Sequence, residues 1–76
     1  MLILYTKDNC QYCEKVKAAF LEMGTVYEDR NIREKIFLDE ARAAGAHTMP
    51  FLVDTFVNKG VGDSDEIIAY VKEGSF

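Results

Sequence analysis

The 76-residue sequence predicts one α/β domain, in which three helices flank a four-stranded mixed sheet in the order β-α-β-α-β-β-α. Three observations predict this class: an unbroken apolar run at the N-terminus, three segments with apolar side chains at helical spacing, and two short apolar segments after the single proline, Pro50. A chain of this length supports one hydrophobic core, and it contains no repeat or linker. We therefore expect residues 1–76 to form a single domain.

The first two predicted elements are a buried strand and a helix. An apolar run such as residues 1–5 is expected of a strand covered on both faces. Residues 11–23 carry apolar side chains at helical spacing, with Gly24 as the stop signal and Asp8 or Asn9 as the N-cap. The side chains expected to face inward from this helix are Cys13, Val16, Phe20 and Met23.

A second strand and a second helix complete a βαβ unit. We place the strand at residues 25–29 and the helix at residues 33–44, with Gly45 past its end. Because crossovers of this kind are right-handed, the two strands should be parallel. The side chains expected to face inward from this helix are Phe37, Ala41 and Ala44.

The last three elements are predicted to be an antiparallel hairpin and a helix. One strand covers residues 51–53 and the other lies within residues 56–61, with the turn at either residues 54–55 or residues 58–60. The final helix begins at residue 63 or 64 and ends at residue 72 or 73. Its inward side chains should be Ile67, Ile68 and Val71.

Composition and charge exclude several classes of function. The net charge is -4 and the nine Lys and Arg residues are scattered, so the chain lacks the basic stripe of a nucleic-acid-binding protein. Every apolar run is far shorter than the roughly 20 residues that cross a bilayer, and the N-terminal run is too short for a signal peptide. We expect a cytoplasmic protein without nucleic-acid or membrane partners.

The two cysteines carry the most specific chemical signal. Cys10 and Cys13 form a C-x-x-C motif at the start of the predicted helix, where free N–H groups favour a thiolate. A free thiol with a pKa of ~8.5 is only about 3% ionised at pH 7, whereas C-x-x-C thiols at helix starts are typically more acidic. Cys10 at the helix cap should attack, and Cys13, one turn further along, should resolve. Lys7 would add positive potential.

Two other interpretations of the cysteine pair are open. The motif could be half of a structural zinc site, although His47 is the only further soft ligand. The cysteines could also be inert core residues. Neither interpretation explains why both thiols lie at the cap of a helix that follows a buried strand.

Three motifs resemble dithiol glutaredoxins. Residues 5–13 (YTKDNCQYC) are similar to the family's Y-[ST]-K-x-x-C-P-Y-C opening, residues 45–50 (GAHTMP) to its G-x-R-T-V-P, and residues 61–67 (VGDSDEI) to its I-G-G-x-D-D-L. The resemblance covers essentially the whole chain. It implies a thioredoxin-like fold, a single glutaredoxin-like domain and a monomeric thiol-disulfide oxidoreductase. Its substrates would be protein disulfides and glutathione mixed disulfides, with glutathione as co-substrate and without a tightly bound cofactor or metal.

The resemblance also implies roles for individual residues. Cys10 would be the nucleophile that carries the mixed disulfide, Lys7 and Tyr12 would contact glutathione, and Met49 would pair with its backbone ahead of a cis Pro50. Free N–H groups at the start of the third helix would hold the γ-glutamyl carboxylate. The implied glutathione-binding set is Lys7, Tyr12, Thr48, Met49, Pro50, Gly62, Ser64 and Asp65.

Three positions depart from the family pattern. Gln11 replaces a frequent proline, His47 replaces an arginine, and Asp63 replaces the second glycine, where its charge could repel an anion. The segment between Pro50 and Val61 is also slightly longer than usual, which indicates an enlarged hairpin.

Two alternative functions are therefore retained. One is a redoxin that thioredoxin reductase recharges and that serves ribonucleotide reductase. The other is a [2Fe–2S] carrier in which Cys10 of two chains and two glutathiones hold the cluster.

Overall fold

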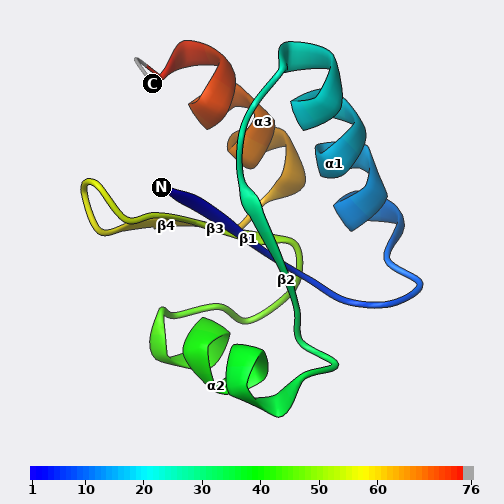
Figure 1. The fold of residues 1–76 in the computed structure, drawn as a ribbon, viewed down its shortest axis with the longest axis vertical. Helices are drawn as coiled ribbons and strands as arrows, with labels where there is room; N and C mark the ends of the chain where they lie inside the picture. The colour runs from blue at the N-terminus through cyan, green and yellow to red at the C-terminus, as the bar shows by residue number, and fades with distance from the viewer. Residues whose placement is uncertain (75–76) are drawn as a thin grey trace.

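The seven predicted elements follow one another in the predicted order in the computed structural model, which describes residues 1–74 (Figure 1). Their bounds are β1 Leu2–Thr6, α1 Gln11–Met23, β2 Glu28–Asn31, α2 Lys35–Ala43, β3 Phe51–Asp54, β4 Lys59–Val61 and α3 Ser64–Glu73.

The four strands form one mixed sheet in the order β2-β1-β3-β4. β1 pairs in parallel with β2 and antiparallel with β3, and β3 pairs antiparallel with β4. Helices α1 and α3 cover one face of the sheet and α2 covers the other (Figure 1). This arrangement is the predicted four-stranded mixed sheet flanked by three helices.

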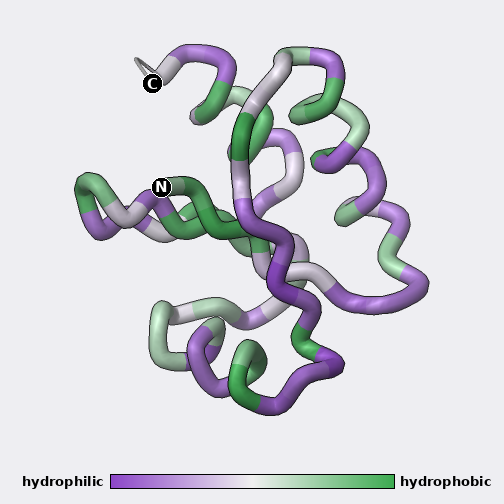
Figure 2. Tube along the Cα trace, viewed as in Figure 1, coloured by the Kyte–Doolittle hydropathy of each residue, from purple (hydrophilic) through white to green (hydrophobic). Residues whose placement is uncertain are grey.

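The central strand β1 contributes to two cores, one on each face. Leu2 and Leu4 pack with side chains of α1 and α3, whereas Ile3 and Tyr5 pack with Ala41 of α2. All five residues of β1 are buried. The unbroken apolar run at the N-terminus therefore marked a strand covered on both sides, as predicted. This strand is also visible as a continuous hydrophobic segment in Figure 2.

The second strand lies further along the chain than predicted. It begins at Glu28, and Glu28 pairs with Ile3. The apolar residue Val26 precedes the strand and is 88% exposed, while Tyr27 packs edge-on against Phe20. β2 lies at the edge of the sheet and has a polar sequence, as is common for edge strands. The prediction followed the apolar residues Val26 and Tyr27, which precede the strand, and therefore placed it too early in the chain.

Some helix details also differ from the prediction. The cap of α1 is Cys10 itself, and neither Asp8 nor Asn9 supplies it. Met23 and Ala44 were expected to face inward and are exposed. Both lie at the C-terminal limits of helices, where the chain turns away from the core: Met23 is the last residue of α1, and Ala44 is the C-cap of α2.

The turn of the β3–β4 hairpin falls between the two predicted positions, at residues 55–58. The carboxylate of Asp54 accepts the Phe56 N–H at 3.0 Å, and Asn58 adopts a left-handed conformation with φ 54°. These two features close a four-residue turn and leave Phe56 83% exposed. In the described part of the chain, no helix is long and apolar enough to span a bilayer.

Candidate active site

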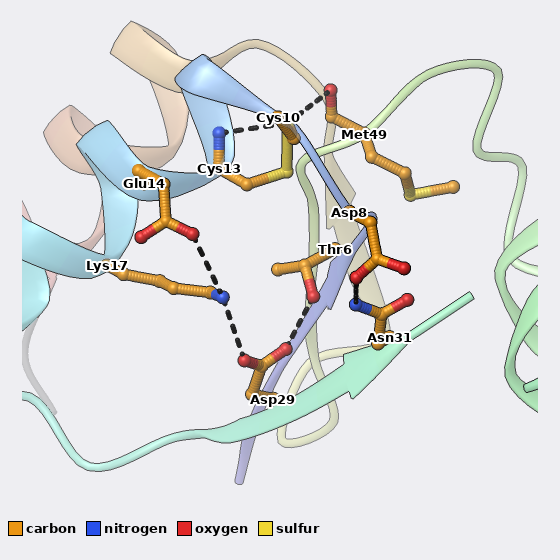
Figure 3. The surroundings of a disulfide bond; sticks show 9 residues. All are labelled: Thr6, Asp8, Cys10, Cys13, Glu14, Lys17, Asp29, Asn31 and Met49. Carbon is orange, nitrogen blue, oxygen red and sulfur yellow. Dashed lines mark hydrogen bonds and ion pairs between the residues drawn. A yellow bond between two sulfur atoms is a disulfide. The ribbon is translucent and has the colours of Figure 1, made fainter. Parts of the chain in front are cut away.

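The two cysteines lie at the junction between the end of β1 and the start of α1 (Figure 3). Asn9, with φ 54°, turns the chain, and Cys10 follows in an extended conformation as the N-cap of the helix. The Cys13 N–H donates a hydrogen bond to Cys10 Sγ at 3.1 Å. The two sulfurs form a disulfide with a Cα–Cα distance of 5.2 Å.

The two cysteines differ slightly in exposure, although both are buried. Cys10 retains 7% of its surface and Cys13 retains none. The N–H groups of the first helical turn are the donors that a helix leaves without intrahelical partners, and one of them already points at Cys10 Sγ. Cys10 is therefore the less completely buried of the two cysteines, and it accepts a hydrogen bond of the kind that favours a thiolate.

The loop before β3 brings Met49 next to the nucleophile. The Met49 carbonyl oxygen lies 3.9 Å from Cys10 Sγ, although Met49 is 39 positions away in the sequence. The Met49–Pro50 peptide bond is cis, as predicted from the glutaredoxin resemblance. Figure 3 shows the Met49 carbonyl directed at the cysteine while its side chain points away.

A polar network fixes the elements beneath the disulfide. The hydroxyl of buried Thr6 donates to Asp29 at 2.6 Å, and Lys17 Nζ lies 3.1 Å from the other Asp29 oxygen and 3.6 Å from Glu14 (Figure 3). Burial lowers the pKa of Lys17, but the hydrogen bond and charge of Asp29 outweigh burial, so the net shift is upward and the ammonium stays charged. Through Lys17, Asp29 and Thr6, the network joins α1 to β2 and β1.

The start of α3 differs from the prediction of free N–H groups. The Asp63 carboxylate caps the helix by accepting the N–H groups of Asp65 at 2.8 Å and Glu66 at 3.3 Å. Lys15 of α1 forms an ion pair of 2.5 Å with the Asp65 side chain. Both the N–H and the carboxylate of Asp65 are thus engaged within the chain. Asp63 is the N-cap, in line with the predicted start of this helix at residue 63 or 64, and its repulsion of a bound anion stays a prediction.

Some of the remaining predicted residues line one groove, and the others lie outside it. Lys7, Thr48 and Met49 line a groove of about 230 Å³ between α2 and the loop before β3. Tyr12 is 61% exposed on the first turn of α1, and Gly62 is exposed just before α3. The structure thus brings Met49 to Cys10, while Tyr12, Gly62, Ser64 and Asp65 lie outside the groove.

The groove also contains residues that the sequence analysis did not assign to the site. Arg42 and His47 line it together with Ile32, Leu38 and Ala46. His47 was noted only as a departure from the glutaredoxin pattern. The sequence contained one weak indication that Arg42 lies near the site, namely its position in the last turn of α2, shortly before Pro50.

A larger groove, of about 810 Å³, lies elsewhere, and neither cysteine lines it. Its walls include Met1, Met23, Val26, Phe56 and Val71. Neither cysteine lines the smaller groove, but Met49, whose carbonyl oxygen lies beside Cys10 Sγ, is one of its walls and links it to the cysteine pair. Within residues 1–74, no group of three or more His, Cys, Asp or Glu residues is arranged to hold a metal ion.

The fold and the cysteine pair define a thioredoxin-like domain with a C-x-x-C disulfide at the N-terminus of its first helix. Comparison with known proteins gives the family. Residues 4–74 match the model for the N-terminal domain of glutathione S-transferase, and the chain belongs to this family.

A comparison with solved structures agrees with this assignment. The crystal structure of wheat glutaredoxin is 23% identical in sequence and has a TM-score of 0.72, with 96% of this chain and 72% of the wheat chain covered. At this level of sequence identity, the structural similarity shows that the two proteins share a fold. A search of curated proteins found no match. The chain therefore has the thioredoxin-like fold predicted from its sequence, and it shares this fold with wheat glutaredoxin.

Proposed function

We propose that this protein is a glutathione-dependent thiol-disulfide oxidoreductase that reduces protein disulfides and glutathione mixed disulfides through Cys10 and Cys13. The coarser class, thiol-disulfide oxidoreductase, is supported by the glutaredoxin-like fold and by the cysteine pair at disulfide distance. The observation that carries the proposal is the position of Cys10, which caps α1 and accepts the Cys13 N–H.

The proposed reaction begins from the reduced dithiol. The Cys10 thiolate attacks one sulfur of the substrate disulfide, the substrate S–S bond breaks, and the released thiolate takes a proton. Cys13 then loses its proton and attacks the Cys10 sulfur, which expels the second substrate thiolate. Two electrons pass to the substrate, whose two protons come from Cys13 and from water, and the Cys10–Cys13 disulfide seen in the structure is the product on the enzyme.

Glutathione restores the dithiol in two exchanges. One glutathione thiolate attacks Cys10, so that Cys10 carries glutathione and Cys13 becomes a thiol. A second glutathione thiolate attacks the glutathionyl sulfur and leaves as oxidised glutathione while Cys10 is released. The family described by the glutathione S-transferase N-terminal domain and the position of Met49 beside Cys10 support a peptide thiol as this co-substrate.

One observation favours a second candidate. The Asp65 N–H and carboxylate, which would serve the γ-glutamyl end of glutathione, are bound by Asp63 and Lys15. A ligand must displace both contacts, and this favours a redoxin recharged by a flavoprotein such as thioredoxin reductase, with ribonucleotide reductase as the partner that receives electrons.

Two coupled assays test the proposal. Reduction of a small glutathione mixed disulfide is measured with glutathione and NADPH-linked glutathione reductase, or with thioredoxin reductase as the only source of electrons. We expect turnover with glutathione. Turnover only with thioredoxin reductase would replace the proposal by the second candidate.

Two cysteine variants test the roles within the pair. Cys10→Ser should abolish both activities, because the one remaining thiol, Cys13, is fully buried and cannot reach a substrate disulfide. Cys13→Ser should still reduce the glutathione mixed disulfide, since glutathione can resolve the Cys10 intermediate, and should lose reduction of protein disulfides. Residual turnover by Cys10→Ser would contradict the mechanism.

A further inference from the structure

The groove beside the candidate active site is basic, although the chain as a whole carries a net charge of -4. Lys7, Arg42 and His47 line it, and the other lining residues are uncharged, namely Ile32, Leu38, Ala46, Thr48 and Met49. These eight residues define the basic groove, which contains three basic side chains and no carboxylate.

The nearby acidic residues are engaged elsewhere. Asp8, the neighbour of Lys7 in the chain, accepts two contacts from Arg33 at 2.7 and 3.0 Å. On α2, Asp39 pairs with Lys35 and Glu40 pairs with Arg30. Throughout residues 1–74, no acidic side chain forms an ion pair with any of the three basic residues of the groove. The charges of Lys7 and Arg42 are therefore not neutralised by an ion pair within the described part of the chain.

The basic groove begins where a substrate would be bound. Met49 is one of its walls, and the Met49 carbonyl oxygen is 3.9 Å from Cys10 Sγ. A peptide whose sulfur is joined to Cys10 must therefore pass close to Met49 on at least one side of its cysteine. The side chains that flank that cysteine are then within reach of the groove.

We infer that the basic groove selects protein disulfides in which an acidic side chain flanks the reacting cysteine. This inference rests on the proposed thiol-disulfide exchange at Cys10 and specifies the substrate class. Arg42 and His47 are the specificity-determining residues, because neither belongs to the predicted glutathione-binding set. Opposite charges in a groove steer association and hold the correct register, so an acidic flank speeds the first exchange.

Single-turnover kinetics separate substrate selection from regeneration by glutathione. The prereduced protein is mixed with disulfide-linked peptides that carry either glutamate or glutamine on both sides of the cysteine. The rate of oxidation is followed by rapid alkylation and mass spectrometry. Exposed charge pairs are worth about 0.2–1 kcal/mol each, so two of them, one for each glutamate, predict a preference of roughly twofold to thirtyfold for the glutamate peptide at low salt.

Variants assign the preference to the groove. The double variant Arg42→Gln/His47→Gln should at least halve the ratio of the glutamate rate to the glutamine rate, by slowing the reaction with the glutamate peptide. Lys35→Gln, which removes one positive charge from the same helix outside the groove, is the matched control and should keep the full preference. Equal rates for the two peptides with the wild-type protein, or an unchanged preference in the double variant, would overturn the inference.

Failure of the proposed exchange would look different. Neither peptide would then oxidise the protein, and the groove is tested instead by titrating the oxidised protein with both peptides and following backbone amide signals by NMR. Tighter binding of the glutamate peptide, with the largest shifts at residues 42 and 47, supports the groove. Equal affinity for both peptides counts against it.

Discussion

Cys10 and Cys13 show how strongly a residue's position alters its chemistry. They have the same side chain, lie three positions apart and are joined to each other, yet only Cys10 retains some exposed surface, 7%, and accepts an N–H from the first turn of α1. In the reduced protein, negative charge on Cys10 is favoured by this donor and by the partial positive charge of the helix N-terminus. Negative charge on buried Cys13 lacks exposure to water.

The alkylation rates of the two thiols test this asymmetry. At pH 7 we expect iodoacetamide to modify Cys10 of the reduced protein at least tenfold faster than Cys13, because thiolate content and access both favour Cys10. Mass spectrometry of digested protein after short exposure distinguishes the two sites. Equal and slow modification of both would mean that the helix terminus does not activate the thiol, and the proposed enzyme would lose its nucleophile.

At the scale of elements, the start of α3 depends on one side chain. The Asp63 carboxylate satisfies the N–H groups of Asp65 and Glu66, which have no partner inside the helix. Lys15 joins this region to α1 through Asp65, but both side chains of that pair are exposed, so the pair contributes little stability. The cap is the more important of the two contacts.

Removal of the cap should be measurable in the free energy of unfolding. Asp63→Ala is expected to cost about 1 kcal/mol, within a range of about 0.5–2 kcal/mol, since both N–H groups then rely on water. Asp63→Asn retains a capping oxygen and should lie within about 0.5 kcal/mol of the wild type. Urea denaturation of the three proteins gives the comparison. A loss of equal size in both variants would show that the charge of Asp63, and not its capping oxygen, stabilises the helix.

The elements that the sequence predicted well are those whose pattern reflects burial. β1 and the inner face of α1 are apolar because they are covered, and the C-x-x-C motif is a local signal. β2 was misplaced because its side chains pair with distant residues, as Asp29 does with Lys17 and Arg30 with Glu40. The same limit hid Arg42, whose place in the groove depends on how α2 packs beside the loop before β3.

The whole molecule consists of two cores separated by one sheet, and the second core contains a titratable group. Tyr5 of β1 is almost fully buried against α2, and its hydroxyl donates to Glu40 at 3.1 Å. Arg30 Nη1 donates to the same Glu40 oxygen at 2.7 Å. Burial, followed by the hydrogen bond to Glu40, raises the pKa of Tyr5 above its ordinary value of 10.0.

This shift predicts a loss of stability at alkaline pH. Because the pKa of Tyr5 is higher in the folded than in the unfolded chain, the stabilisation is complete below pH 10 and is lost as the pH rises towards the folded value. The pKa of Tyr70 is also raised, chiefly by its hydrogen bond to Asp54, and contributes in the same direction. The free energy of unfolding in urea should therefore fall between pH 9 and pH 11.

Tyr5→Phe provides the control for that decline. The variant keeps the ring in the α2 core and removes the ionisable hydroxyl, so its stability should fall less steeply than that of the wild type over the same pH range. At pH 8 it should be destabilised by about 1 kcal/mol through the lost hydrogen bond to Glu40. An identical slope for both proteins would exclude Tyr5 as a source of the alkaline instability and would shift the explanation to the α3 side of the sheet, where Tyr70 binds Asp54.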